Sequence, residues 1–387
     1  MTAGGPTGWQ KIRAEFPALR GRTFLNTATY GQLPKRATAA VLEHLERRDR
    51  FACTDFLEWF DDLDELRGAV ARMIEAKPDD IAFITAACHG LATVLSGIDW
   101  KPGDEILTLE HEFPNNLYAV QSQAGVTGKE CAWSELEQSV TSRTRLVLLS
   151  TVNYVTGLRL DLDGVIRRLR ERNVLVYVDG TQSLGALRFD CAATQPDFLS
   201  VDAYKWMISP NGAGFLYVRP EVREWLRPNV IGWRSDRNWR GVDNLHHGAP
   251  RLHDSSEKYE GGMVVFSALY AMRASISLME EIGTTVIEER VLQLAGEIRR
   301  QMTALGAELY PHQKPFLPSQ IVLAKLPGVD VSAFAKQLQS EGIIVSTRKG
   351  HLRVSPHFYN DERDIEKLTE AVKRNISHAG LNAIGAR

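Results

Sequence analysis

The chain has 387 residues, 44% of them hydrophobic and 24% charged, and a formal net charge of −2 at pH 7. This length exceeds what a single hydrophobic core usually supports, so we expect two domains. The near-zero charge removes the long-range attraction to polyanions and argues against a nucleic-acid partner. No apolar run approaches the length of a membrane-spanning helix, and Met1 to Arg22 has no apolar segment behind a basic patch, so we expect a cytoplasmic protein without membrane contact.

The first half of the chain predicts a sheet that is buried on both faces. Short apolar runs alternate with helix-like stretches, and the expected strands are 81–84, 105–109, 146–150, 174–178, 198–201 and 214–218. Several of these runs are apolar at every position, which is typical of parallel strands covered by helices. The pattern therefore indicates an α/β domain, in which ligands bind at the carboxyl ends of the strands.

After Gly283 the pattern changes to that of a compact α+β unit. Strands are expected at 321–323, 343–346 and 352–355, and helices at 286–305, 331–341 and 362–375. The segment 227–259 shows neither period and predicts an ordered loop. We expect a large domain of residues 21–280 and a small domain formed by residues 1–20 and 281–387.

Two polar residues follow predicted strands and should lie at one edge of the sheet. Asp179 comes directly after the strand 174–178, and Lys205 follows the strand 198–201. Alone, an aspartate there is most often a helix cap and a lysine is most often solvated. Together they fit pyridoxal phosphate chemistry, in which a lysine forms a Schiff base with the cofactor and a carboxylate keeps the pyridine nitrogen protonated. The four cysteines form no C-x-x-C pair, and no metal site is indicated.

Two further loops fit the same cofactor. Thr-Ala-Ala-Cys-His-Gly at 85–90 follows a strand and opens a helix, whose N-terminal N–H groups can bind a phosphate. The loop 110–116 could place the ring of Phe113 against the pyridine ring. Without the other loops, each is more simply a packing feature.

The order of these loops, from 26–31 to 352–360, resembles the class V aminotransferase family of pyridoxal phosphate enzymes, in the branch of kynureninases, isopenicillin N epimerases and cysteine desulfurases. The resemblance covers nearly the whole chain. Its most specific parts are Asp179-x-x-Gln182, the block 202–206 leading into 212–215, and the stretch 353–360. It implies fold type I, with a mostly parallel seven-stranded sheet covered by helices and a smaller α+β C-terminal domain.

The resemblance also implies a role for each matching residue. Lys205 and Asp179 would be the catalytic Schiff-base lysine and the partner of the pyridine nitrogen. The other implied cofactor contacts are Gln182, Cys88, His89, Phe113, Asn153, Tyr204, Trp233, Gly262 and Met263. The implied substrate contacts are Arg353, which would bind the α-carboxylate, and Asn153, Ala28 and Thr29. Around the substrate side chain we expect Thr29, Tyr30, His111 and Arg234.

The same resemblance implies a homodimer with shared active sites. The segment 259–263 resembles the one that reaches the phosphate of a neighbouring subunit. Many relatives have threonine where Met263 stands, and methionine has no side-chain donor, so any contact there would use its backbone N–H.

The cofactor residues do not select one reaction. From a common carbanion, protonation or loss of a substituent leads to transamination, elimination or epimerisation. Desulfurases of the family use a mobile cysteine upstream of the arginine, and the stretch 344–351 contains none. We therefore expect a pyridoxal phosphate-dependent aminotransferase or a β-eliminating C–S or C–C lyase that acts on a small α-amino acid. The alternatives are an epimerase of the isopenicillin N epimerase type and a non-catalytic module that keeps the fold. A nicotinamide enzyme would need G-x-G-x-x-G, which 212–214 lacks.

Overall fold

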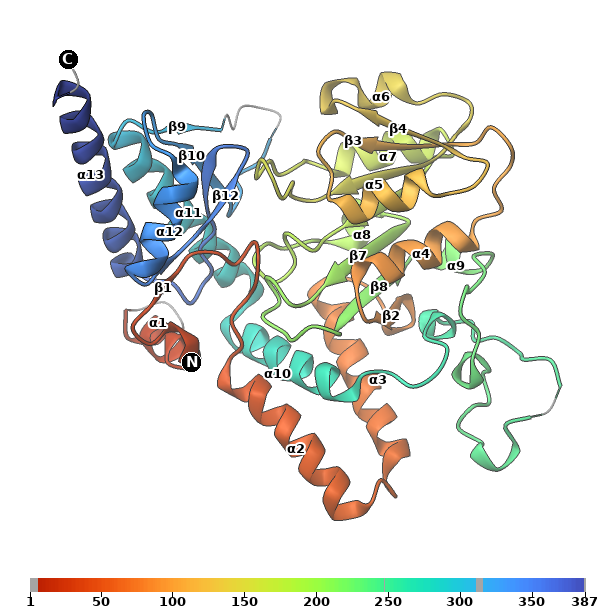
Figure 1. The fold of residues 1–387 in the computed structure, drawn as a ribbon. Helices are drawn as coiled ribbons and strands as arrows, with labels where there is room; N and C mark the ends of the chain where they lie inside the picture. The colour runs from red at the N-terminus through yellow and green to blue at the C-terminus, as the bar shows by residue number, and fades with distance from the viewer. Residues whose placement is uncertain (1–5, 247, 311–315, 386–387) are drawn as a thin grey trace.

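The computed structural model describes residues 6–246, 248–310 and 316–385. Its helices are α1 (Pro6–Arg13), α2 (Lys35–Phe51), α3 (Phe56–Met73), α4 (Ala87–Gly97), α5 (Pro114–Gln121), α6 (Leu136–Ser139), α7 (Asp163–Glu171), α8 (Cys191–Thr194), α9 (Pro220–Arg223), α10 (Phe266–Ile282), α11 (Thr284–Ala304), α12 (Val331–Ser340) and α13 (Glu362–Gly385) (Figure 1). Its strands are β1 (Thr23–Phe24), β2 (Ile81–Ile84), β3 (Glu105–Leu109), β4 (Thr127–Cys131), β5 (Thr144–Ser150), β6 (Leu175–Asp179), β7 (Phe198–Asp202), β8 (Gly214–Val218), β9 (Glu308–Leu309), β10 (Val322–Lys325), β11 (Ile343–Ile344), β12 (Ser346–Arg348) and β13 (His351–Val354).

The large sheet has seven strands in the order β2-β8-β7-β6-β5-β3-β4. Strand β8 is antiparallel to both of its neighbours, and the other pairs are parallel. All strands except β8 therefore point the same way, and their carboxyl ends share one edge. The predicted α/β fold with a mostly parallel seven-stranded sheet is confirmed.

Alternate residues of the central strands enter two different cores. Leu146 and Leu148 of β5 pack into the core that contains the apolar side chains of α4. Val147 and Leu149, one residue further along in each case, pack into the core that contains α3, α7 and α10. Helices thus cover both faces, which explains why this strand is apolar at every position.

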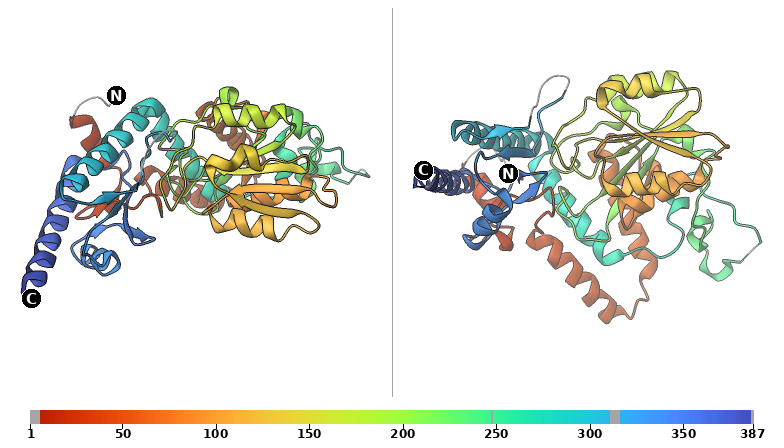
Figure 2. Two further views of the ribbon diagram at one scale, coloured as in Figure 1. Left: turned by 90° about the horizontal axis from the view of Figure 1, so that it is seen from above. Right: turned by 45° about the horizontal axis from the view of Figure 1, so that its top comes forward.

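A second, four-stranded sheet has the order β12-β13-β10-β9 and packs against α11, α12 and α13. Figure 2 shows it in a lobe beside the large sheet, with both ends of the chain on that lobe. Strand β1 pairs with β11, so residues near the start of the chain join the region of this sheet. The domain division at residue 280 stays a prediction, and its parts at 1–5, 311–315 and 386–387 lie outside the described residues. No helix in the described ranges is long and apolar enough to span a bilayer.

Candidate active site

The central feature of the carboxyl edge is a buried lysine. Lys205 follows β7 in the turn region that leads to β8 and is 7% exposed. Its Nζ lies 5.3 Å from the ring centroid of Phe113 and 5.4 Å from that of Tyr204. No carboxylate oxygen of the described residues lies within 4.0 Å of it. Burial lowers the pKa of the Lys205 amine to about 8.

Glycines allow other segments to press against the backbone of this lysine. The Gly31 N–H donates to the Tyr204 carbonyl over 2.9 Å, and a Cβ at Gly31 would lie 1.8 Å from the Lys205 carbonyl oxygen. Gly185, at a φ of +101°, likewise leaves no room for a Cβ beside the carbonyl of Trp206. These two close approaches hold the lysine loop in one position.

Asp179 ends β6, the strand next to β7, and is 8% exposed. Its Oδ1 accepts the Thr181 N–H over 2.9 Å, and its Oδ2 accepts Nδ2 of Asn116 over 3.5 Å. The same Asn116 nitrogen lies 3.3 Å from Oε2 of Glu112. Burial raises the pKa of the Glu112 carboxyl. Asn116 and Glu112 were not predicted, because no local motif marks them.

Gln182 connects the lysine loop to the N-terminal segment. Its Oε1 accepts the Trp206 indole N–H over 3.0 Å, and its Nε2 donates to the Ala28 carbonyl over 3.0 Å. On the other side of Trp206, the fully buried His357 donates from Nε2 to the Trp206 carbonyl over 2.7 Å. Burial lowers the pKa of His357 to about 3, so this imidazole is neutral. The structure thus places Gln182 beside the lysine loop, with one amide hydrogen still available.

Arg353, on β13, is a buried guanidinium without a counter-ion. It is 0% exposed, and its nitrogens donate to Oγ of Ser346, to the Tyr154 carbonyl and to Oγ1 of Thr29. Within the part of the chain that the structure describes, no carboxylate lies within 4.0 Å of it. Burial and the neighbouring Arg348 lower its pKa below the usual range. Nη1 and Nη2 each keep one N–H, the fork that binds a carboxylate.

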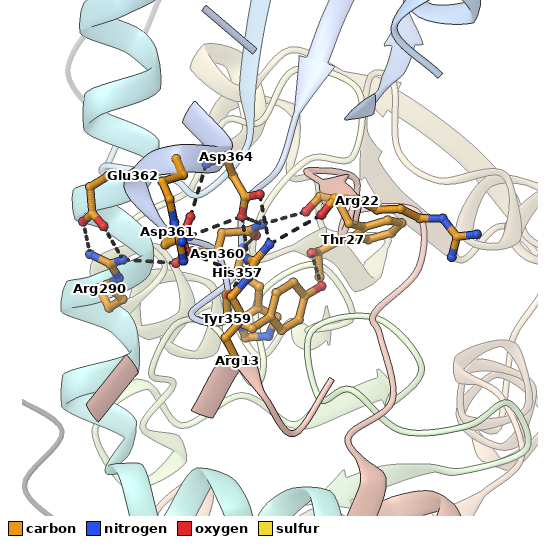
Figure 3. Close-up of polar contacts among 12 residues, drawn as sticks. Arg13, Arg22, Thr27, Arg290, His357, Tyr359, Asn360, Asp361, Glu362 and Asp364 are labelled. Atoms are coloured by element: carbon orange, nitrogen blue, oxygen red, sulfur yellow. Dashed lines mark hydrogen bonds and ion pairs between the residues drawn. The ribbon is translucent and has the colours of Figure 1, made fainter. Parts of the chain in front are cut away.

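The segment after Arg353 is anchored by a polar cluster behind the site (Figure 3). Arg13 donates to the Tyr359 carbonyl over 2.9 Å and to Asp364 over 2.6 Å. The Tyr359 hydroxyl meets Oγ1 of Thr27 at 2.7 Å, and Asn360 donates to the Phe24 carbonyl over 2.9 Å. These contacts tie the C-terminal stretch 353–360 to the N-terminal segment that carries Ala28 and Thr29.

At the start of α4, one backbone donor is left for a ligand. The Ala87 N–H donates to Oδ1 of Asp202 over 2.9 Å, and the His89 N–H donates to the Ala86 carbonyl over 2.9 Å. Among the described residues, no oxygen accepts the Cys88 N–H between them. Of the two residues predicted to contact the phosphate, Cys88 therefore has the backbone N–H that is free to donate.

Asn153 and Phe113 belong to two loops that contact each other. Asn153 donates to the His111 carbonyl over 3.0 Å, and its Oδ1 accepts the backbone N–H groups of Val155 and Thr156. The Phe113 ring stands edge-on to the Tyr154 ring, with centroids 5.1 Å apart. Phe113 of one loop lies against the Lys205 amine, and the Tyr154 carbonyl of the other accepts from Arg353.

The predicted contacts Trp233, Gly262 and Met263 form a separate group. In the described residues, no hydrogen bond or ring contact joins them to Lys205 or Asp179. Glu260, two residues before Gly262, is buried and accepts from Arg67 and from Arg234. Arg234 is 1% exposed and held in this ion cluster, so it does not line the side-chain pocket. Met263 is 59% exposed at the surface.

The chain matches the model of the Aminotransferase class-V family over residues 55–368. It is 22% identical to an uncharacterised aminotransferase of Bacillus subtilis, an alignment covering 95% of this chain and 98% of that protein. It is 28% identical to the isopenicillin N epimerase of Amycolatopsis lactamdurans, covering 95% and 98% of the two chains.

Solved structures share the fold. An apo cysteine desulfurase from Thermococcus onnurineus is 21% identical with a TM-score of 0.87, covering 98% of this chain and 100% of that one. The cystine C-S lyase C-DES, in complex with its product cysteine persulfide, is 24% identical with a TM-score of 0.85, covering 92% and 99%.

Proposed function

The chain belongs to the aminotransferase class-V family of pyridoxal phosphate-dependent enzymes, and on this premise we propose that Lys205, Asp179 and Arg353 form the active site of an aminotransferase or β-eliminating lyase that acts on an α-amino acid. One observation carries the proposal: among the described residues, the buried Lys205 amine has no carboxylate oxygen within 4.0 Å, and it lies at the edge of the sheet where Asp179 ends β6. Burying such a group costs the fold stability. We therefore attribute the burial of Lys205 to a catalytic role and not to packing.

The residues present fit pyridoxal phosphate. When bound, this cofactor supplies a ring that takes up electrons when a bond to the substrate's α-carbon breaks. We assign its attachment to Lys205, its ring nitrogen to Asp179 and one ring face to Phe113. Gln182 offers its free amide hydrogen, and the Cys88 N–H and the Tyr204 hydroxyl are donors for the phosphate. We assign Asn153 a contact to the cofactor and the substrate. Burial and the Asp202 charge raise the pKa of Tyr204 to about 12, so its hydroxyl remains a donor at neutral pH.

The chain's own side chains would then perform the remaining tasks. Arg353 binds the α-carboxylate through its two free N–H groups, and Thr29 fixes the orientation of the guanidinium. Ala28, through its carbonyl, holds Gln182 in place. The Lys205 amine, with a pKa near 8, is partly unprotonated at neutral pH and can carry a proton to or from the α-carbon.

The similar proteins and the absence of one cysteine limit which reactions are compatible with the site. A persulfide-forming desulfurase needs a cysteine upstream of the arginine, and residues 344–351 contain none. A lyase that uses the cofactor without a cysteine nucleophile and an aminotransferase are both compatible with the site, and the similar proteins include the cystine C-S lyase C-DES and an uncharacterised aminotransferase. The 28% identity to an isopenicillin N epimerase favours an epimerase as the second candidate.

We also propose a cytoplasmic homodimer in which Trp233, Gly262 and Met263 reach the phosphate of the second copy. Around this segment, Val230, Ile231, Met263 and Val265 are 56%, 57%, 59% and 42% exposed, a group of apolar side chains that a second subunit would cover. Met263→Glu should shift the protein toward monomer in light scattering. A wild-type monomer at micromolar concentration would contradict the proposal.

The cofactor assignment is tested by trapping. The purified protein should show visible absorbance from bound cofactor, and borohydride reduction followed by peptide mapping should place the adduct on Lys205. Lys205→Met should give no adduct, whereas Lys258→Met, which changes another buried lysine, should still give one. An adduct on a different lysine, or none in the wild type, refutes the assignment.

A further inference from the structure

A second guanidinium lies beside Arg353 on the same hairpin. Strand β12 pairs with β13 so that Ser346 faces Arg353 and Arg348 faces His351. Side chains alternate along a strand, so Arg348 shares the face of Ser346 and Arg353 and lies nearer the turn. Arg348 is half-buried, and the one hydrogen bond it donates runs to the Thr347 carbonyl over 2.7 Å. Among residues 6–246, 248–310 and 316–385, no carboxylate lies within 4.0 Å of its guanidinium.

The charge of Arg348 affects two residues of the candidate active site. Its charge lowers the pKa of both Lys205 and Arg353, which places it in the neighbourhood of both groups. The next residue, Lys349, puts its Nζ 3.1 Å from each ring nitrogen of His111. His111 lies in the loop after β3 that also carries Phe113. A basic rim, formed by Arg348, Lys349 and His111, therefore borders the space above Lys205.

The backbone of this rim is left-handed at the two residues that meet. His111 has a φ of +65° and Lys349 a φ of +44°, a left-handed conformation that residues other than glycine rarely adopt. At Lys349 the hairpin explains this conformation: Lys349 and Gly350, with a φ of +73°, form the two-residue turn between the paired residues Arg348 and His351, and a type I′ turn requires a positive φ at both positions. The turn brings the Lys349 ammonium within hydrogen-bond distance of the His111 ring.

We propose that Arg348, with Lys349 at the rim, binds a negatively charged group on the substrate's side chain, so that the substrate is an α-amino acid with an anionic side chain. The inference rests on the proposed function, because it assigns the α-carboxylate to Arg353. That carboxylate neutralises one of two uncompensated guanidinium groups on the same face. A second carboxylate, or another anion on the side chain, neutralises the other and relieves its repulsion of Arg353.

Binding of amino acids to the holoenzyme tests this, with the change in cofactor absorbance as the readout. Aspartate, glutamate and 2-aminoadipate should bind about tenfold or more tightly than asparagine, glutamine and norleucine, since a hydrogen bond to a charged group contributes about that factor. Arg348→Gln should raise the Kd of the acidic amino acids about tenfold and leave that of the neutral ones nearly unchanged. Arg348→Lys should retain most of the preference, and Arg300→Gln, on the exposed face of α11, should retain all of it.

The outcomes separate the two proposals. If neutral amino acids bind as well as acidic ones, or if Arg348→Gln weakens both classes equally, the anionic side chain is refuted while the proposed function stands. If no amino acid changes the spectrum of a cofactor-loaded enzyme, the proposed function fails and this inference with it. Circular dichroism of each variant checks that it is folded.

Discussion

Replacing Lys205 by methionine should stabilise the protein without its cofactor. Burial lowers the pKa of this lysine from 10.5 to about 8, and one pH unit corresponds to about 1.4 kcal/mol. The charged amine therefore costs the folded state about 3 kcal/mol at pH 7. Methionine has a similar length and no charge, so Lys205→Met should raise the free energy of unfolding by about that amount.

The pH dependence makes this prediction specific. The folded-state pKa is lowered, so the cost is fully present below pH 8 and disappears as the pH rises toward 10.5, where the unfolded chain also loses the proton. The gain from Lys205→Met should accordingly shrink between pH 8 and pH 10.5. Guanidinium unfolding of cofactor-free protein at several pH values measures it.

Lys258 supplies the matched control. It is also 7% exposed, but its Nζ donates to the Arg223 carbonyl over 2.6 Å. Lys258→Met leaves that carbonyl without its donor and should destabilise the protein. A gain for Lys205→Met that is equal at pH 7 and pH 10, or a loss at pH 7, would mean that another group already compensates the amine. The reasoning about Lys205 would then be refuted.

Three further changes test the surroundings of the site. Gly31→Ala forces a Cβ against the Lys205 carbonyl, so it should lower the free energy of unfolding by about 1–3 kcal/mol and weaken cofactor binding at least about tenfold. In the control Gly296→Ala, the new Cβ has no atom within 4 Å, so this change should stabilise α11. An unchanged cofactor affinity in Gly31→Ala would contradict the packing argument. Arg353→Lys should raise the Kd of every α-amino acid about tenfold in absorbance titrations, because an ammonium cannot form the fork; an unchanged Kd would remove Arg353 from the site. The pKa of His357 is about 3 in the folded state, so the free energy of unfolding should fall by about 1.4 kcal/mol for each pH unit below pH 6.5 because of this group. His357→Gln should remove this pH dependence in urea unfolding between pH 6.5 and pH 4.5. If the variant and the wild type have the same slope, the imidazole is not the group responsible.

The strands of the large sheet were predictable where both faces are buried. Strands 81–84, 105–109 and 214–218 were predicted with the bounds that the structure has. Strand β4 was missed, because its sequence Thr-Gly-Lys-Glu-Cys is polar and its residues at the sheet edge are mostly exposed. At the opposite edge, β2 is buried at all four positions and was predicted, so it is the exposure of β4, and not its edge position, that leaves its sequence without an apolar run.

The small lobe shows a second limit. The predicted strand 343–346 is divided in the structure between β11 and β12, which pair with β1 and β13 respectively. The apolar pattern predicts extended backbone but not the partner. Where one apolar stretch pairs with two different strands, tertiary contacts decide at which residue the first strand ends and the second begins.

In the candidate site, sequence order placed Asp179 and Lys205 after strands that the structure shows to be neighbours. Arg353 came from the resemblance, and its lack of a counter-ion became visible only in the structure. Asn116 and Glu112 could not be predicted, because their contacts to Asp179 and Ser150 join residues far apart in the chain. The approach of Arg348 to the lysine likewise depends on how the hairpin meets the large sheet.

The strap of residues 23–31 has a consequence for how the protein matures. Its backbone is fixed by Gly342, Ile344 and Ser355, and it ends against the carbonyl of Tyr204, where its last glycine covers the lysine loop. Residues 23–31 can therefore take up this position only after residues 342–355, far later in the chain, have been synthesised. We therefore expect that a nascent chain halted before residue 355 does not retain the cofactor.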